Sequence, residues 1–395
     1  MKASSINKNV VQLAFAQALM MSVNTLLLTS SAIIGFELTE NKALATLPLA
    51  IQFFATMMTT IPASLMMNRF GRRLGFIFSS IIGFAGSLLA IYAVMQESFV
   101  IFCLATALFG VYTGFGNYFR FVATEVAPPG HSNTAISYVL AGGVLAAFIG
   151  PNLANYSKDA FDIAYLGSFI AVFVLYILNL FNILLMDLPK PINQALNEYA
   201  RSLREIASQP VFIVALLSAA IGFSMMSLLM TATPLAMKHV HLPFSDVAFI
   251  IQWHVLGMFA PSFFTGHLIN RFGNLPIIFI GGLFMLVSIA TNLLGTSIWH
   301  FWFALFALGL GWNFMFIGGT SLLTTTYNEA EKAKTQALND FTVFTTVTFA
   351  SLGAGVLQYQ LGWVMVNISV IPFILISLLS VVWLSSKARQ NSKIT

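Results

Sequence analysis

The stretch MMNRFGRRLGF, residues 66–76, sets three arginines between two long apolar runs. A helix needs about 20 apolar residues to cross the hydrocarbon layer of a membrane, and both runs are long enough. The whole chain has 395 residues, of which 58% are hydrophobic and 8% are charged. A soluble domain is typically about 25% charged. The composition therefore indicates a membrane protein, and the arginines belong to a short loop at one membrane surface.

Stretches without Asp, Glu, Lys or Arg recur along almost the whole chain. They cover residues 9–36, 43–68, 74–96, 98–119, 126–157, 163–186, 206–237, 247–270, 272–328 and 341–386. The first eight have room for one membrane-spanning helix each, and the last two have room for two each. The sequence therefore predicts an all-α membrane protein with twelve transmembrane helices.

The basic residues indicate how these helices are oriented. With the N-terminus in the cytoplasm, 15 of the 18 basic residues fall in cytoplasmic segments, and only Lys42, Lys158 and Lys238 fall outside. Basic loops of membrane proteins stay in the cytoplasm. We therefore expect a multi-pass protein of the bacterial cytoplasmic (inner) membrane with both termini in the cytoplasm. On charge alone, the loop at 66–76 is equally well explained as an anchor at the inner surface.

The chain is expected to consist of two pseudo-symmetric halves. The longest polar interruption, residues 187–210, separates six predicted spans from six. We predict an N-terminal six-helix half at 1–186, a cytoplasmic linker at 187–208 and a C-terminal six-helix half at 209–395. NRFGRR at 68–73 is echoed by NRFGNL at 270–275, and GFGN at 114–117 by GLGWN at 309–313. A parallel repeat of six-helix halves is typical of transporters that bind substrate between the halves near the bilayer midplane.

The repeated loop resembles a motif of a known family. SLMMNRFGRRLGF, residues 64–76, is similar to the motif G-x-x-x-D-R-x-G-R-R/K between helices 2 and 3 of the major facilitator superfamily, and the resemblance covers essentially the whole chain. The matching residues are Arg69, Gly71, Arg72 and Arg73. Ser64 and Asn68 replace the first glycine and the aspartate of the motif.

Three further segments carry the same resemblance. The second copy of the loop keeps Gly266, Arg271 and Gly273 but has Asn270 for the aspartate and lacks the final arginine pair. ATEVAPPG at 123–130 looks like the end of helix 4 in the family. AFIGPNLAN at 147–155 resembles the Gly-Pro motif of helix 5, with Gly150 and Pro151 in place and other positions changed. In the family this motif is associated with antiporters, so export is favoured over uptake.

The resemblance also implies a cytoplasmic gate, in which arginines of the loop hold an acid at the end of helix 4. The matching acid is Glu125, and we expect Arg72 and Glu125 to form a pair that breaks when the cytoplasmic face opens. The alternative is a set of unpaired anchor charges. The predicted gate residues are Asn68, Arg69, Gly71, Arg72, Arg73, Glu125 and Arg271.

Two charged residues lie in predicted helices next to the uncharged stretches, close to the cytoplasmic ends. Arg120 precedes Glu125 by five residues, about 7.5 Å along a helix, so it must reach the surface, find a partner or face a water-filled cavity. We expect it to pair with Glu125 or Asp340, or else to contact an anionic substrate. Asp340, near the start of helix 11, is a candidate for proton coupling. Its alternative role is an acid stabilised by the positive end of the helix dipole.

Polar and aromatic side chains in otherwise apolar helices are the candidates for a substrate cavity. They are Gln17, Asn24, Gln52, Arg120, Gln252, Trp253, His254 and Asn313. His254 lies about 12 Å into helix 8 and titrates near neutral pH, so it is a second candidate for proton coupling, with a hydrogen-bonded core role as the alternative. The segments GFSMMSLLM at 222–230 and WNFMF at 312–316 are candidates to line a pocket for an apolar or aromatic solute.

These observations together predict a monomeric secondary active transporter. It is expected to move a small organic solute by alternating access, coupled to protons, with export favoured. The alternatives are a nutrient uptake permease for a vitamin, an amino acid or a siderophore, and a membrane sensor or assembly protein that has lost transport. The chain has no phosphate-binding glycine loop, G-x-S-x-G or H-E-x-x-H, so no enzyme activity is expected. The expected partners are the solute, protons and the lipid bilayer, with no cofactor, metal or nucleic acid.

Overall fold

The N-terminal part of the chain folds into long apolar helices, because backbone groups inside a membrane must satisfy their hydrogen bonds internally. The computed structural model describes residues 8–128, 132–188, 200–328 and 330–391. The helices before the linker are α1 (Lys8–Leu38), η1 (Lys42–Leu44), α2 (Leu47–Phe70), α3 (Arg72–Met95), α4 (Phe99–Gly116), α5 (Phe119–Val126), α6 (Ser132–Ser157) and α7 (Leu166–Leu184). Helices α4 and α5 continue one span across a short turn.

The second part repeats this pattern after a short polar helix. These elements are α8 (Leu203–Ala207), α9 (Pro210–His239), α10 (Phe244–Phe259), α11 (Ser262–Phe272), α12 (Asn274–Leu294), α13 (Ile298–Leu323), η2 (Thr324–Thr326) and α14 (Lys332–Asn391). Helix α8 begins with a capping box between Ser202 and Glu205. It lies in the predicted linker, of which residues 189–199 fall outside the described part of the chain.

The predicted number of spans is confirmed. Eleven segments of the described chain are long and apolar enough to cross a membrane. The last of them, Lys334–Lys387, is two helices that meet at Gly362, where φ is 75°. Counting it twice gives twelve spans, an even number that returns both ends of the chain to the same side. We call that side the inner end, because it is expected to be cytoplasmic, and the opposite side the outer end.

The two copies of the repeated loop have the same backbone geometry. Gly71 joins α2 to α3 with φ 95° and ψ 155°, and Gly273 joins α11 to α12 with φ 84° and ψ 165°. Only glycine adopts this region readily, because a Cβ atom would clash with the backbone. The glycine of the motif is therefore required in both halves by the tight connection between two spans.

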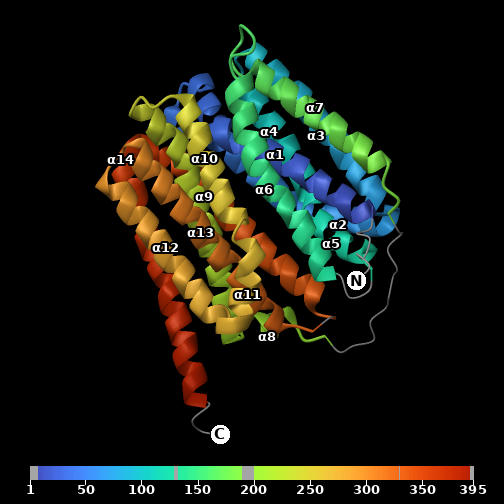
Figure 1. The fold of residues 1–395 in the computed structure, drawn as a ribbon, viewed down its shortest axis with the longest axis vertical. Helices are drawn as coiled ribbons and strands as arrows, with labels where there is room; N and C mark the ends of the chain where they lie inside the picture. The colour runs from blue at the N-terminus through green and yellow to red at the C-terminus, as the bar shows by residue number, and fades with distance from the viewer. Residues whose placement is uncertain (1–7, 129–131, 189–199, 329, 392–395) are drawn as a thin grey trace, which may run out of the picture.

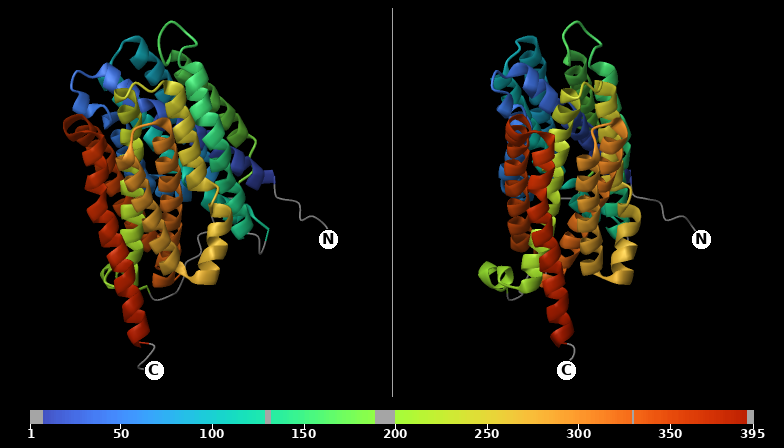
Figure 2. Two further views of the ribbon diagram at one scale, coloured as in Figure 1. Left: turned by 60° about the vertical axis from the view of Figure 1, so that its left-hand side comes forward. Right: turned by 90° about the vertical axis from the view of Figure 1, so that its left-hand side faces the viewer.

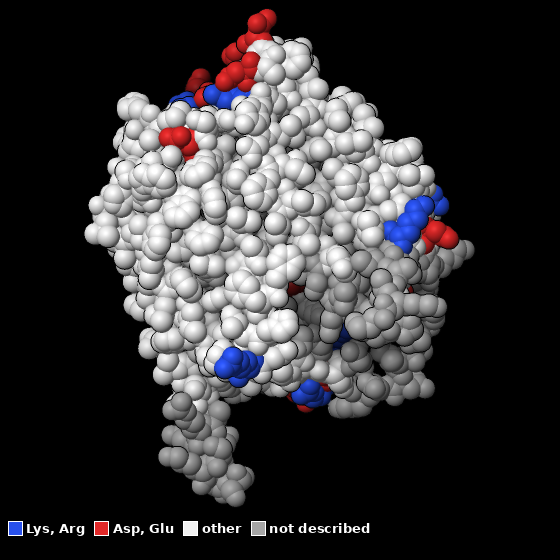
Figure 3. Space-filling view, viewed as in Figure 1, with Lys and Arg blue, Asp and Glu red and all other residues white. Residues whose placement is uncertain are grey.

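The two bundles meet near the outer end and diverge toward the inner end (Figure 1). The last part of α14 extends beyond the other helices at the inner end (Figure 2). The space-filling view shows a recess between the halves near the inner end, with basic and acidic atoms inside it (Figure 3). The structure is thus open toward the expected cytoplasmic side.

Small residues bring α6 against α1 in the N-terminal half. A Cβ atom on Gly150 would lie 1.8 Å from Thr25 Oγ1, and one on Gly142 would lie 2.8 Å from the backbone nitrogen of Ala18. Thr25 Oγ1 also donates a hydrogen bond to the carbonyl of Ala146 at 3.1 Å. Close packing through small residues is how membrane helices associate without a hydrophobic driving force. Pro151 lies inside α6 one residue after this contact.

Candidate functional site

Contacts between the halves hold the outer end closed. Glu37 at the end of α1 forms an ion pair with Lys238 at the end of α9, at 2.8 Å. Thr46 Oγ1 accepts a hydrogen bond from the backbone nitrogen of Gly355 in α14, at 3.1 Å. Lys158 Nζ lies 5.1 Å from the ring centroid of Phe244 in the other half. These contacts must break if the outer end is to open.

Further contacts join the halves between the outer end and the middle of the membrane. Asn152 in α6 donates a hydrogen bond to Gln252 Oε1 in α10, at 2.6 Å. Thr345 in α14 contacts the sulfur of Met57 in α2, at 2.9 Å. Gln252, predicted as a cavity residue, therefore sits at the contact between the halves with Asn152, which the sequence did not single out.

The predicted pair between Arg72 and Glu125 is present. Arg72 Nη2 donates to Glu125 Oε1 at 2.8 Å, and Nε donates to Oε2 at 3.3 Å. Both residues belong to the N-terminal half, and the pair is intact although the inner end is open. The geometry differs here from the expected gate, because a pair within one half does not have to break when the halves separate. It braces the loop between α2 and α3 against α5.

The other predicted gate residues form no side-chain hydrogen bond or ion pair with Arg72 or Glu125 in the described structure. Arg73 Nη2 donates to the carbonyl of Leu184 at the end of α7. Asn68 and Arg69 are exposed in the last turn of α2. Arg271 is exposed in the last turn of α11, with its guanidinium 5.2 Å from the ring centroid of Phe272. The loop residues thus meet their own half or the surface, and their role in gating stays a prediction.

Arg120 and Asp340 are charged residues of different halves, near the inner ends of their helices. Arg120 on α5 is close enough to Asp340 on α14 for Coulomb attraction, yet the two form no ion pair in the described chain. The Nε atom of Arg120 is buried, and it has no hydrogen-bond partner among the described residues. Asp340 accepts a hydrogen bond from the side chain of Asn339, at 3.1 Å. One charge comes from each half, so a change in the distance between the halves changes their interaction.

His254 is fully buried inside the C-terminal half. Its Nδ1 lies 2.7 Å from the carbonyl oxygen of Leu305 in α13, a distance at which Nδ1–H donates, and its Nε2 has no partner within the described residues. This is the hydrogen-bonded core position that was the alternative for His254. Trp253 packs against Trp302 and Phe306 of α13, with centroids 5.5 Å and 6.2 Å away. A role of His254 in proton coupling stays a prediction.

Asn24 connects three helices of the N-terminal half. Its Oδ1 accepts hydrogen bonds from Gln52 Nε2 in α2 at 3.1 Å and from Thr113 Oγ1 in α4 at 3.2 Å. Gln17, on the same face of α1 two turns closer to the inner end, is buried. Asn24 and Gln52, both named as cavity candidates, are therefore in direct contact, and the structure adds Thr113 to them.

Asn313 is not at the cavity position that the sequence predicted. It is fully buried, its Oδ1 accepts from Thr265, and its Nδ2 donates to the carbonyl of Met258 at 2.6 Å and to Ser262 Oγ at 2.8 Å. These three partners flank the break between α10 and α11. The asparagine amide satisfies backbone and side-chain groups that the broken helix leaves unpaired, which explains an amide at this depth.

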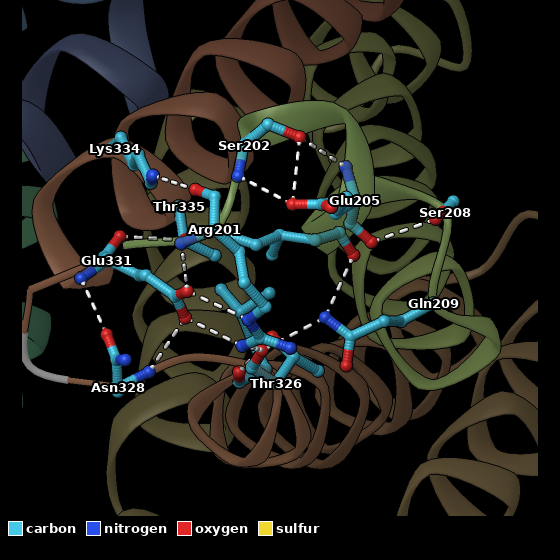
Figure 4. A network of polar contacts seen from close by, with 12 residues as sticks. Arg201, Ser202, Glu205, Ser208, Gln209, Thr326, Asn328, Glu331, Lys334 and Thr335 are labelled. Carbon is cyan, nitrogen blue, oxygen red and sulfur yellow. Dashed lines mark hydrogen bonds and ion pairs between the residues drawn. The ribbon is translucent and has the colours of Figure 1, made fainter. Parts of the chain in front are cut away.

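The polar network around Arg201 was not predicted from the sequence. Arg201, just before α8, donates to Glu331 from its backbone nitrogen, Nε and Nη2 at 2.7, 2.8 and 2.6 Å (Figure 4). Arg201 also donates to the carbonyl of Thr326, and Lys334 donates to the carbonyl of Arg201. The hydrogen bonds from Arg201 lower the pKa of Glu331 to about 2. The network fastens the linker to the C-terminal half.

The partners in these networks are far apart in sequence. Arg201 and Glu331 are separated by 130 positions, and Glu37 and Lys238 by 201. Each of these residues lies in a short polar segment between apolar runs, where a charge is equally well explained as a membrane anchor. The sequence offered one indication of pairing, which is that oppositely charged residues occur in loops at the same side of the membrane.

Comparison with known proteins agrees with this architecture. The sequence model described as Major Facilitator Superfamily matches residues 13–251 and 215–395. The chain belongs to the major facilitator superfamily. It is therefore a transporter and not an enzyme, as predicted from the loop motif and the twelve spans. A curated member, the riboflavin transporter RfnT of Brucella anthropi, is 37% identical over 384 residues, which cover 96% of each chain.

More distant members of the superfamily are also similar. The uncharacterized MFS-type transporter YdeG of Bacillus subtilis is 28% identical over 329 residues, with 79% of this chain and 76% of YdeG covered. Among solved structures, an inward-facing, occupied bacterial homologue of the human lysosomal transporter Spinster has a TM-score of 0.71 at 16% identity, with 96% of each chain covered. An outward-facing bacterial homologue of ferroportin has a TM-score of 0.64 at 15% identity, with 96% of this chain and 100% of that one covered. The solved structures show the fold alone.

Proposed function

We propose that this chain carries riboflavin, or a flavin with the same ring system, into the cell. The observation that supports this substrate is the 37% identity with a riboflavin transporter across 96% of both chains. Uptake is preferred over export because riboflavin is a vitamin, and because the helix 5 pattern behind the export expectation is incomplete in this sequence. Vitamin uptake was the alternative in the sequence analysis.

Alternating access is the transport mechanism that the contacts favour. The ion pair of Glu37 with Lys238 and the hydrogen bond of Asn152 with Gln252 join the halves on the outer side of the molecule. The inner end carries the recess (Figure 3). Arg120 and Asp340 come from different halves and attract each other without a direct ion pair in the described chain. In the outward-open state, the outer contacts separate, and Arg120 and Asp340 approach each other as the inner end closes.

Proton coupling through Asp340 is part of the proposal. A carboxylate opposite an arginine of the other half keeps its charge when the two are close and takes up a proton more readily when they are apart. Protonation of Asp340 would thus accompany opening of the inner end. The inner membrane location and the cytoplasmic position of both termini complete the proposed topology.

The decisive experiment is riboflavin uptake in a bacterial strain that cannot synthesise the vitamin and has no other importer. Expression of this chain should restore growth on low external riboflavin and give accumulation of labelled riboflavin. Arg120→Ala should abolish both while membrane levels of the protein are unchanged. Accumulation of a different solute, with no riboflavin flux in either direction, would remove riboflavin as the substrate.

The coupling is tested separately in proteoliposomes. Asp340 takes up its proton while the inner end is open and releases it as that end closes, so wild-type uptake should increase when the inside is made more acidic than the outside. Asp340→Asn should lose this dependence while it still exchanges riboflavin. Asp162→Asn, in an exposed outer loop, is the matched control and should behave as wild type. A proton dependence that survives in Asp340→Asn would exclude Asp340 as the coupling residue.

A further inference from the structure

The most enclosed helices of the two halves each leave one part of their surface accessible. In α9, every residue from 218 to 237 is buried except Phe223. In α1, every residue from 16 to 35 is buried with three exceptions. These are Met21, Asn24 and Leu28, whose spacing places them on one face of the helix. Both helices are surrounded by others, so these side chains face space inside the protein and not lipid.

Asn24 and Phe223 lie at the same depth. Helix α1 covers Lys8–Leu38 and α9 covers Pro210–His239, so each residue is within about two positions of the middle of its helix. Transporters built from parallel six-helix repeats bind substrate near this level. The two accessible faces are therefore at the depth where a solute crosses between the halves.

Phe223 is the centre of a group of aromatic side chains from four helices of the C-terminal half. Its ring centroid lies 5.5 Å from Trp312, 5.4 Å from Phe316 and 6.0 Å from Phe344. Trp312 is stacked on Phe316 with an interplanar angle of 11°, and it also contacts Phe259. We refer to these five residues as the aromatic wall. It offers both ring faces and ring edges to a planar ligand.

The aromatic wall faces the N-terminal half. A Cβ atom on Gly143 of α6 would lie 2.7 Å from Cγ of Phe259, so this ring rests directly on the backbone of the other half. Phe53 of α2 packs with Phe223 and Phe316 against the same small cluster of buried residues. Thr320, one helical turn from Phe316 toward the inner end, is exposed. The surface of α13 is thus accessible one turn below the wall.

Unpaired polar atoms lie beside this space. Gln52 is 5% exposed, and its Nε2 donates to Asn24 while its Oε1 has no partner among the described residues. Asn24 uses only its Oδ1, so within the described structure its Nδ2 donors are free. On the aromatic wall, Trp312 is 6% exposed, and its Nε1 has no partner in the part of the chain that the structure describes. Buried polar groups are normally paired, so these atoms point to a hydrogen-bonding ligand.

We propose that Asn24 and Gln52 together with the aromatic wall form a split site for a planar heteroaromatic solute. This inference rests on the proposed function and assigns the residues that select the substrate. The ring system stacks on one of Phe223 and Phe316 and meets the edge of the other, since the two rings are at 74° to each other. Its polar edge meets the two amides of the N-terminal half. Binding joins the halves at the midplane, so the same contacts that select the solute also favour closure around it.

The chemistry of a flavin fits both sides of this site. Its three fused rings form one flat surface, which matches the stacked and edge-on rings of the wall. One edge of the ring system carries an imide N–H between two carbonyl oxygens. Gln52 Oε1 accepts from such an N–H, and Asn24 Nδ2 donates to the neighbouring carbonyl. A neutral donor and acceptor pair suits an uncharged imide better than a charged side chain would.

The test is calorimetric titration of the purified full-length protein with riboflavin, with lumichrome as the ring system alone, and with ribitol as the side chain alone. Wild type should bind riboflavin and lumichrome, and should not bind ribitol. Phe223→Ala should weaken both flavins about tenfold or more, the usual effect of removing a stacking side chain. Phe223→Leu keeps the bulk without the aromatic face, so it should also weaken binding even if Phe223→Ala folds poorly.

A matched control separates the wall from aromatic residues in general. Phe349 is on the same helix as Phe344, but the residue is 70% exposed at the surface of the protein. Phe344→Ala should weaken lumichrome, and Phe349→Ala should not. For the polar side, methylation of the imide nitrogen should weaken binding to wild type and have little further effect in Gln52→Leu. Equal losses in both proteins would overturn the assigned role of Gln52.

The outcomes distinguish this inference from the proposed function. Riboflavin binding that is unchanged in Phe223→Leu and Phe344→Ala overturns the split site and leaves riboflavin transport standing. A protein that binds other planar heteroaromatics through Phe223 but not riboflavin supports the site and overturns the proposed substrate. If wild type binds no planar heteroaromatic compound, both are overturned.

Discussion

The inner ends of the two halves use the same backbone turn with different electrostatic partners. In the N-terminal half, the loop after the turn supplies Arg72, which holds Glu125 of the same half. In the C-terminal half, Asn274 and Leu275 stand where the arginine pair would be, and the acid Glu331 is held by Arg201 from the linker. Both copies of the loop have the same backbone geometry, but in the C-terminal half the arginine that binds the acid comes from the linker and not from the loop.

This difference gives the linker a structural role. The Arg72–Glu125 pair is partly exposed, whereas the carboxylate of Glu331 is fully buried and receives three hydrogen bonds from Arg201. The inner end of the C-terminal half is therefore tied to the segment that joins the halves. The linker takes part in the fold of that half, and the predicted boundary at 208 separates residues that the network holds together.

The largest expected effect comes from Arg201→Ala. It leaves the buried carboxylate of Glu331 without its main partner, which strongly destabilises a protein. The thermal unfolding midpoint at neutral pH should fall more than for any other change described below. Arg204→Ala, an exposed arginine of the same linker, is the control and should leave the midpoint nearly unchanged.

The pH dependence identifies the cause. The pKa of Glu331 is lowered from an ordinary 4.5 to about 2, so its pairing stabilises the fold fully above about pH 4.5 and is lost as the pH falls toward 2. The difference in thermal unfolding midpoint between wild type and Arg201→Ala should therefore become smaller as the pH is lowered from about 4.5 to about 2. A gap that is constant with pH would mean that lost packing, and not the ion pair, is responsible.

The next largest loss of stability is expected at Gly71 and Gly273, the two loop glycines whose backbone geometry is the same in both halves. Gly71→Ala and Gly273→Ala should each destabilise the protein by about 1–3 kcal/mol, because alanine is strained at these backbone angles. No atom lies within 4 Å of a Cβ built on Gly71, and the nearest to one on Gly273 is 3.9 Å away, so the loss is conformational. Similar shifts in the unfolding midpoint would support equal turns, whereas a loss at only one position would contradict the structural repeat.

The smallest effect is expected for the N-terminal brace. Partly exposed ion pairs contribute about 0–1 kcal/mol, so Glu125→Gln should lower stability only slightly. Because the pair lies within one half, the balance between inward-open and outward-open states should also change little. Distances between spin labels on the two inner ends measure that balance. A large shift toward the inward-open state, reversed by exchanging Arg72 and Glu125, would restore the gate that the sequence predicted.

Sequence reasoning worked best for properties that depend on local composition. The spans follow from apolar length, and the turns at Gly71 and Gly273 follow from the motif itself. The contact of Arg72 with Glu125 was also predicted, because the family resemblance named both positions. Arg201, Glu37 and Lys238 were not predicted as partners, since each sits in a polar segment where several charges were equally available.

The substrate site was predictable only in outline. The segments around Phe223 and Trp312 were marked as possible lining, but so were Asn313 and His254, which the structure places inside the C-terminal half. Helices that are apolar on every side carry no periodic signal to distinguish a face toward the cavity from one toward a neighbour. The rotation of each helix was therefore undetermined before the helices were packed.

The sequence by itself determined the number of helices, their expected orientation and the repeat, because membrane thickness and loop charge act on short segments independently. The tertiary structure alone decided which side chains meet. It brought Arg201 to Glu331, kept Arg120 and Asp340 from forming an ion pair, and brought Asn24 into contact with Gln52 and Thr113. These pairings depend on the relative rotation and tilt of helices that are far apart in sequence, and on the separation of the two halves, which no local pattern specifies.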